Sequence, residues 1–209
     1  MLVCDEHKWI FLRNPKTASR SVTRALRDNF VTRNKQNYHG WKISEPKPFT
    51  EVVPFQTADF LFSYPRPQSQ ELSGYFVFTT VRNPYERVVS GWQYFNKKKG
   101  DLNFNEYVNS ISGKRKRFPF ETFPIRQTDV LDLIRGVHIL RYENLEEDFN
   151  ALPFVGQQIV LPQVGVQTYD DWKSHYTLDL ETKVYELLQI DFERLGYKRL
   201  NFNEQISLL

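Results

Sequence analysis

The chain has 209 residues, and its 40% hydrophobic and 15% aromatic content excludes a disordered protein. The length allows one sizeable core, so we expect a single domain over residues 1–209. A formal net charge of +3 suits an anionic ligand but is too small for a protein that coats nucleic acid. The one cysteine, Cys4, excludes an internal disulfide framework, and apolar runs no longer than a strand predict neither a signal peptide nor a membrane span. These features are typical of a cytoplasmic or otherwise soluble protein.

A strand, a turn and a helix are predicted at the start of the chain. The apolar run Trp9–Leu12 indicates a buried strand, and Arg13-Asn14-Pro15 indicates a turn. From Ala18 to Phe30 the apolar residues recur at helical spacing. A helix that begins directly after such a turn presents backbone N–H groups and the positive end of its dipole at one point.

Polar side chains gather at the same turn. Lys16 contributes a cation, and hydroxyl groups come from Thr17, Ser19 and Ser21. We interpret this arrangement as a socket for an anion such as phosphate or sulfate. The alternative is an ordinary capped helix, whose hydroxyls satisfy the N–H groups of its own first turn.

A second strand and helix follow a long segment, residues 31–74, whose prolines, glycines and aromatic residues predict loops of the kind that often wall a substrate site. Residues 75–81 form the clearest strand, and Pro84 is expected as the first residue of the next helix. One face of that helix carries an apolar stripe made by Tyr85, Val88, Val89, Trp92 and Phe95. A different face is expected to carry Arg87, Ser90 and Tyr94.

The rest of the chain repeats the alternation of strands and helices. A third buried strand is predicted over residues 137–140, with helices near residues 103–111, 145–152 and 179–191. This order implies an α/β fold, a three-layer sandwich with a central, mostly parallel sheet flanked by helices. The three strands run into Arg13, Arg82 and Arg141. Ligands of such sheets bind beyond the carboxyl ends of the strands, so we expect an anionic ligand at this edge.

The first turn differs from the phosphate-binding loop of ATP and GTP hydrolases. The pair Lys16-Thr17 matches the end of the GxxxxGK[ST] pattern, but the loop has no glycine. The neighbouring strands end in arginine where a metal-holding aspartate would stand. We therefore expect direct charge pairing to anchor the ligand, without a metal.

Two of these segments resemble the sulfotransferases that use 3′-phosphoadenylyl sulfate (PAPS). Residues 15–21, Pro-Lys-Thr-Ala-Ser-Arg-Ser, are similar to the loop that binds the 5′-phosphosulfate. Residues 82–90, Arg-Asn-Pro-Tyr-Glu-Arg-Val-Val-Ser, are similar to the strand–helix motif that binds the 3′-phosphate. Residues 141–145, together with Asp191-Phe192 and Gly196-Tyr197, resemble the carbohydrate branch of that family.

The resemblance implies a P-loop-like fold and a reaction in which a sulfuryl group passes from PAPS to a hydroxyl of an acceptor, a glycan. It implies that the donor is held by Lys16, Thr17, Ala18, Ser19, Arg20, Ser21, Arg82 and Ser90. Arg82 can grip a phosphate bidentately, and Ser90 adds a hydroxyl donor. Arg20 stands where many relatives carry a small or hydroxyl residue, so it either adds a phosphate contact or points to solvent.

The resemblance also assigns catalytic roles. Lys16 would neutralise the charge that develops on the transferring group. His39 lies between the two motifs, where related glycan enzymes carry a catalytic histidine, and it is our candidate for the general base. His175 is the second candidate and a glutamate the third. His138 lies in a predicted strand and is expected to be structural, and His7 is expected at the wrong end of the sheet.

Two other functions remain open. The first is a non-catalytic module that holds a nucleotide or a polyanion through basic loops such as Lys114-Arg115-Lys116-Arg117. The second is a nucleotide kinase, which would require Mg²⁺.

Overall fold

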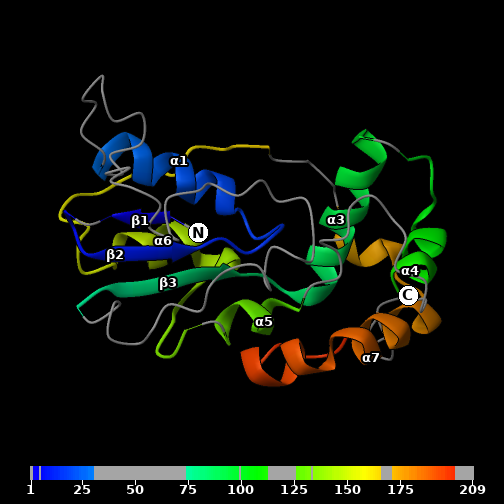
Figure 1. Cartoon of the computed structure of the whole chain (residues 1–209). Helices are drawn as coiled ribbons and strands as arrows, with labels where there is room; N and C mark the ends of the chain where they lie inside the picture. Colours follow the sequence, from blue (N-terminus) through cyan, green and yellow to red (C-terminus); the bar gives the residue numbers. More distant parts are fainter. Residues whose placement is uncertain are drawn as a thin grey trace, which may run out of the picture. The chain divides into compact units, whose positions relative to one another are not determined.

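The computed structural model describes residues 2–4, 6–30, 74–98, 100–112, 126–132, 134–165 and 171–200 (Figure 1). By their internal contacts these residues fall into two compact units. The first unit spans Met1–Arg82 and Asp129–Val166, and the second spans Asn83–Thr128 and Gln167–Leu209. The expectation of a single domain stays a prediction.

The first unit is built on a four-stranded sheet with the order β1-β2-β3-β4. Its strands are β1 (Leu2–Cys4), β2 (Trp9–Leu12), β3 (Phe76–Val81) and β4 (His138–Arg141). β2, β3 and β4 run parallel, with Phe11 opposite Phe78 and Thr79 opposite Ile139, whereas β1 pairs antiparallel with β2. The predicted α/β fold with a mostly parallel sheet is therefore confirmed.

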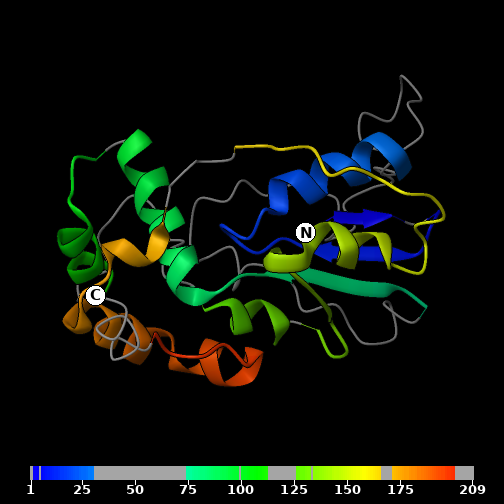
Figure 2. The same cartoon turned by 180° about the vertical axis from the view of Figure 1, so that it is seen from behind.

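Helices cover both faces of this sheet because successive side chains of a strand point to opposite sides. One face presents Trp9, Phe11 and Phe78 to α1 (Ser19–Phe30) and α6 (Leu145–Asn150). The other face presents Ile10, Leu12 and Val77 to Val130 of α5 (Gln127–Leu131). Figure 2, seen from behind, shows α6 in front of the strands. The predicted layers are thus present, with the apolar core between sheet and helices.

Two strands differ from the prediction. β1 was not predicted, and it lies outside β2 as the edge strand of the sheet. β4 was expected to be buried throughout, but Leu140 is its only buried residue, because β4 is the outermost of the described strands on the other side of the sheet. His138 begins this strand with an exposed side chain whose ring centroid lies 5.3 Å from that of Phe76.

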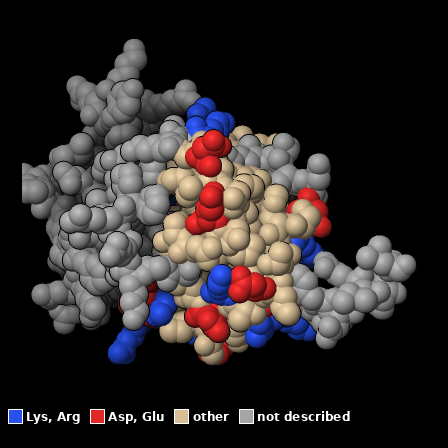
Figure 3. All heavy atoms as spheres, turned by 90° about the vertical axis from the view of Figure 1, so that its right-hand side faces the viewer, with Lys and Arg blue, Asp and Glu red and all other residues tan. Residues whose placement is uncertain are grey.

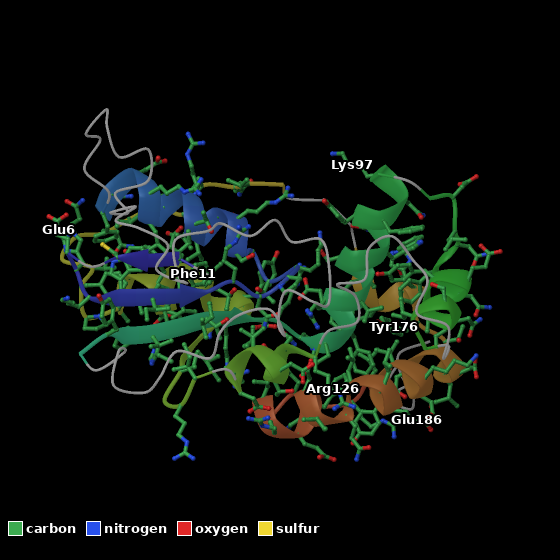
Figure 4. The ribbon with its side chains drawn as sticks, viewed as in Figure 1. Glu6, Phe11, Lys97, Arg126, Tyr176 and Glu186 are labelled. Atoms are coloured by element: carbon green, nitrogen blue, oxygen red, sulfur yellow. The ribbon has the colours of Figure 1, made fainter. Side chains whose placement is uncertain are left out.

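The second unit is helical. It contains α3 (Pro84–Lys98), α4 (Phe104–Ser112), a 3₁₀ turn (Trp172–His175) and α7 (Leu178–Leu195). Apolar residues at helical spacing on α3, α4 and α7 meet in one core that includes Val88, Val108 and Val184. Tyr176, labelled in Figure 4, belongs to this core, and its hydroxyl donates to the carbonyl of Tyr85 at 2.8 Å. The predicted helices of this unit are confirmed.

The last helix runs further than predicted. α7 continues past Asp191 to Leu195 and ends at Gly196, whose φ of 70° is the left-handed conformation that glycine adopts without strain. The N–H of Tyr197 then donates to the carbonyl of Phe192 at 3.0 Å and closes the helix end.

Figure 3 shows acidic and basic side chains interspersed on the face that it draws. Among the helices that the structure describes, none is long and apolar enough to cross a membrane.

Candidate anion-binding site

The turn from β2 to α1 has a strained backbone. Lys16 and Ala18 have φ values of 64° and 58°, in the left-handed region that residues with a Cβ rarely enter. Each such residue costs about 1–2 kcal/mol relative to a right-handed conformation. Strain of this kind persists only where the surroundings impose it, and it is common at functional sites.

Thr17, between the two strained residues, fastens the turn to the sheet. Its side chain is fully buried, and its hydroxyl donates to the carbonyl of Asn14 at 2.9 Å. The same hydroxyl lies 2.6 Å from the hydroxyl of Thr80 on β3. Thr17 was expected to bind the ligand, but these bonds commit its hydroxyl to the protein, so its remaining group for a ligand is the backbone N–H.

The helix that follows begins without a polar cap residue. The carbonyl of Ala18 accepts the N–H groups of Ser21 and Val22 at 2.9 and 3.3 Å, which makes Ala18 the cap residue of α1. Alanine has no side-chain oxygen to offer the first-turn N–H groups. Nearby hydroxyls bond elsewhere: Thr23 donates to the carbonyl of Ser19, and Ser21 accepts the N–H of Val164. These bonds do not have the pattern of the capped-helix alternative.

Three cations crowd around this turn. The pKa of the Lys16 ammonium is lowered to about 8, chiefly by burial and then by the nearby guanidinium groups of Arg82 and Arg20, in that order of effect. Arg82, which follows β3, is only 4% exposed, and its Nη1 lies 3.5 Å from the carbonyl oxygen of Lys16. Its guanidinium also lies 3.8 Å from the ring centroid of Tyr142, which follows β4. The structure therefore brings the cations of the two predicted motifs together beyond the carboxyl ends of β2 and β3.

The turn that precedes α3 has an ordinary cap. The side-chain oxygen of Asn83 accepts the N–H of Tyr85 at 3.0 Å, and Pro84 is the first helical residue, as predicted. Ser90, further along α3 in the second unit, is 7% exposed. Arg87, which was expected on a different face from the apolar stripe of α3, is fully buried, with its Nη1 3.8 Å from a carboxylate oxygen of Asp191. Sequence reasoning missed this partner, because the pair is distant in sequence.

The histidines divide between the described and undescribed parts of the chain. His39, the candidate base, lies outside the described residues, as does the basic run 114–117. His7 lies in the turn before β2, next to the labelled Glu6 in Figure 4 and at the amino end of the parallel strands, as expected. His175 is half-buried, with its ring centroid 5.0 Å from that of Trp92 and 5.7 Å from that of Phe104.

The buried Glu181 of α7 has the contacts of a structural carboxylate. The hydroxyl of Tyr85 and the guanidinium of Arg199 both donate to it. Burial alone would raise its pKa, but the hydrogen bonds from Arg199 and Tyr85 outweigh burial and hold the pKa below the usual value. A carboxylate so engaged is a poor general base.

In the described part of the chain, no three His, Cys, Asp or Glu side chains gather as metal ligands would.

The fold and the turn after β2 define an α/β protein of the P-loop-like class. The model of the sulfotransferase family matches residues 1–198, and the chain therefore belongs to the sulfotransferase family. An uncharacterized protein of Archaeoglobus fulgidus is 38% identical over 93 residues, which are 43% of this chain and 72% of that protein. No solved structure matches the chain. Family membership supports sulfuryl transfer as the reaction.

Proposed function

We propose that this protein transfers a sulfuryl group from PAPS to a hydroxyl of a carbohydrate acceptor. The observation that carries the proposal is the convergence of Lys16 and Arg82 at the carboxyl edge of the sheet, where the guanidinium of Arg82 lies 3.5 Å from the carbonyl oxygen of Lys16 and its charge lowers the pKa of the Lys16 ammonium. Neighbouring cations repel one another, and a ligand with several negative charges would relieve that repulsion. PAPS carries its charges at two ends, on the 5′-phosphosulfate and on the 3′-phosphate.

In this proposal the turn after β2 binds the phosphosulfate. The N–H groups of residues 17–20 would donate to its oxygens at the positive end of α1, and Arg20 and Lys16 would add charge. The second group of donors would bind the 3′-phosphate through the guanidinium of Arg82 and the hydroxyl of Ser90. The full set is Lys16, Thr17, Ala18, Ser19, Arg20, Ser21, Arg82 and Ser90.

The chemical step would then be an in-line displacement at sulfur. His39 would take the proton of the acceptor hydroxyl while the acceptor oxygen bonds to sulfur, and the bond from sulfur to the bridging oxygen breaks. Lys16 would stabilise the negative charge that develops on that bridging oxygen. The products are the sulfated acceptor and adenosine 3′,5′-bisphosphate (PAP), and no metal takes part.

One assay tests the reaction. The protein is incubated with PAPS and a panel of glycans and small phenols, with and without EDTA, and sulfated products are sought by mass spectrometry. We expect a sulfated glycan in both conditions. Absence of any product would overturn the proposal, a sulfated phenol would overturn the carbohydrate assignment, and loss of product with EDTA would overturn metal independence.

Calorimetry tests the donor site separately. Wild-type protein should bind PAP more tightly than adenosine 5′-monophosphate (AMP), and Arg82→Met should reduce that preference by about 10- to 100-fold, as expected for charge-assisted hydrogen bonds. Arg24→Met is the matched control, because Arg24 is an exposed arginine of α1 that pairs with Asp28 at 2.8 Å. The non-catalytic module would give a different result. The protein would bind the two nucleotides equally, and neutralisation of residues 114–117 would abolish its binding of polyanions.

A further inference from the structure

A buried carboxylate on α7 meets residues of α3 and the first two residues of α5, all of which belong to the second unit. Asp191 is fully buried, and one of its oxygens accepts the N–H of Gln127 at 2.8 Å. Its other oxygen accepts the N–H and the hydroxyl of Thr128 at 3.0 and 2.8 Å. These bonds cap the start of α5, and the carboxylate also faces Arg87 of α3.

Arg87 is committed to the protein interior. Its side chain is fully buried, and its Nη1 lies 3.8 Å from Oδ2 of Asp191. The phenol of Tyr107 on α4 is also within its electrostatic reach, because the charge of Arg87 opposes the rise that burial causes in the pKa of Tyr107. A buried guanidinium held between α4 and α7 leaves α3 little freedom to rotate or slide.

Ser90 stands three residues after Arg87 on the same helix, where side chains are neighbours on the helix surface. We propose that Asp191, acting through Arg87, is a positioning residue that holds Ser90 in register for the 3′-phosphate of the donor. This inference rests on the proposed function, in which Ser90 donates to that phosphate. Asp191 touches neither the donor nor the acceptor in this scheme.

A role confined to stability makes a different prediction. If Asp191 only stabilises the fold, its loss lowers the melting temperature but leaves the folded protein with the same preference for PAP over AMP. If Asp191 positions Ser90, the preference itself falls, because only the 3′-phosphate contact is displaced. Binding of AMP, which lacks the 3′-phosphate, should then stay close to the wild-type value.

The experiment is a double-mutant cycle read by calorimetry with PAP and AMP. Asp191→Asn and Ser90→Ala should each reduce the preference for PAP by about ten-fold, the effect of one hydrogen bond to a charged group. The double variant should lose no more than Ser90→Ala alone, since Asp191 acts through Ser90. Thr128→Val removes only one hydroxyl bond to Asp191 and should reduce the preference for PAP by about three-fold. This variant keeps the inference testable if Asp191→Asn does not fold.

Glu181→Gln is the matched control. Glu181 is also a buried carboxylate of α7, but its arginine partner is Arg199, which lies outside α3. Its contact with α3 is the hydroxyl of Tyr85, and the glutamine of the variant keeps an acceptor oxygen for that hydroxyl. This variant should lower the melting temperature and keep the preference for PAP. An equal loss of preference in Glu181→Gln, or additive losses in the double variant, would overturn the inference.

The two proposals fail in distinguishable ways. Wild-type protein that binds PAP and AMP equally would overturn the proposed function and this inference together. Wild-type protein that prefers PAP, with that preference unchanged in Asp191→Asn and Thr128→Val, would overturn the inference alone.

Discussion

The turn after β2 and the turn after β3 both lead from a parallel strand into a helix, but they begin their helices differently. Before α3, Asn83 caps the helix with its own side chain and Pro84 fits the first helical position. Before α1, Ala18 stands at the cap position with a φ of 58° and no side-chain oxygen. A self-capped turn can hold an anion mainly through side chains such as Arg82, whereas α1 is arranged so that a bound anion can serve as its cap.

The two turns also differ in how their charges are balanced. At the β2 turn, Arg82 and Arg20 both act on Lys16 as like charges. On α3, the buried Arg87 faces the carboxylate of Asp191, which has further hydrogen-bond donors of its own. The comparison separates a buried cation that faces a carboxylate, as in a structural ion pair, from cations that lie near one another, an arrangement that favours an anionic ligand. Four predictions test it.

Lys16→Met should have the largest effect. Loss of one preorganised charge at the transferring group is expected to lower sulfuryl transfer by about 10²- to 10³-fold, measured with labelled sulfate. Lys8→Met is the matched control. Lys8 lies in the turn before β2 and also has a positive φ, 50°, but its cation is placed over the ring of Tyr75 and not at the β2 turn. Equal losses in the two variants would show that the backbone, and not the charge, matters.

The same substitution should change how stability depends on pH. The pKa of Lys16 is about 8 in the folded protein and 10.5 ordinarily, so the unfolded chain binds more protons between these values and stability rises with pH across that window. Lys16→Met removes the cost of burying the charge and should raise the free energy of unfolding at pH 7 by at most about 3 kcal/mol. Denaturant unfolding from pH 7 to 11 measures this, and a constant difference between the two proteins would contradict the crowding of charge at this turn.

Asn83→Ala should remove the cap of α3. The free energy of unfolding is expected to fall by about 1 kcal/mol, measured by urea denaturation. Asn144→Ala is the control, since Asn144 stands at the start of α6 but makes no capping hydrogen bond with its side chain. A loss in Asn144→Ala as large as in Asn83→Ala would remove the distinction between a capped and an uncapped start.

Ala18→Gly should have the smallest effect and the opposite sign. Glycine adopts a positive φ without strain, which more than offsets its larger loss of chain entropy, so the free energy of unfolding should rise by about 0.5 kcal/mol. Ala151→Gly should lower it instead, because Ala151 ends α6 with an unstrained φ of −83°. Thermal unfolding of the two variants measures both changes in stability. Destabilisation by Ala18→Gly would argue against strain at this turn.

Local patterns in the sequence predicted most of the fold. β2, α1, β3 and α3 were predicted close to their observed bounds, because strand and helix periodicities are properties of short windows. β1 and α5 were missed, since elements of 3 and 5 residues are too short to show a period. The exposure of β4 depends on which strands neighbour it, and no pattern within β4 contains that information.

The closeness of the predicted cations could be inferred from the sequence, but the partners of the predicted hydroxyls could not. Lys16 and Arg82 both follow strands that pair in parallel, so the carboxyl-edge rule places them near each other. Thr17 was predicted as a ligand, yet its hydroxyl bonds to Thr80, 63 positions away. Ser21 likewise accepts from the N–H of Val164, 143 positions away. Such distant partners cannot be inferred from one sequence, which is why the use of each hydroxyl required the structure.

The chain's only thiol lies in the edge strand β1, so its reactivity can report how often this edge of the sheet opens. Cys4 is the single cysteine of the sequence and is buried where β1 pairs with β2. Its alkylation requires β1 to detach, so the rate of labelling measures how often this edge opens. A slow rate that follows global unfolding would mean that β1 is an integral part of the sheet. A fast rate would mean that the edge of β2 is intermittently open to pairing with another chain, an aggregation route that storage conditions should then suppress.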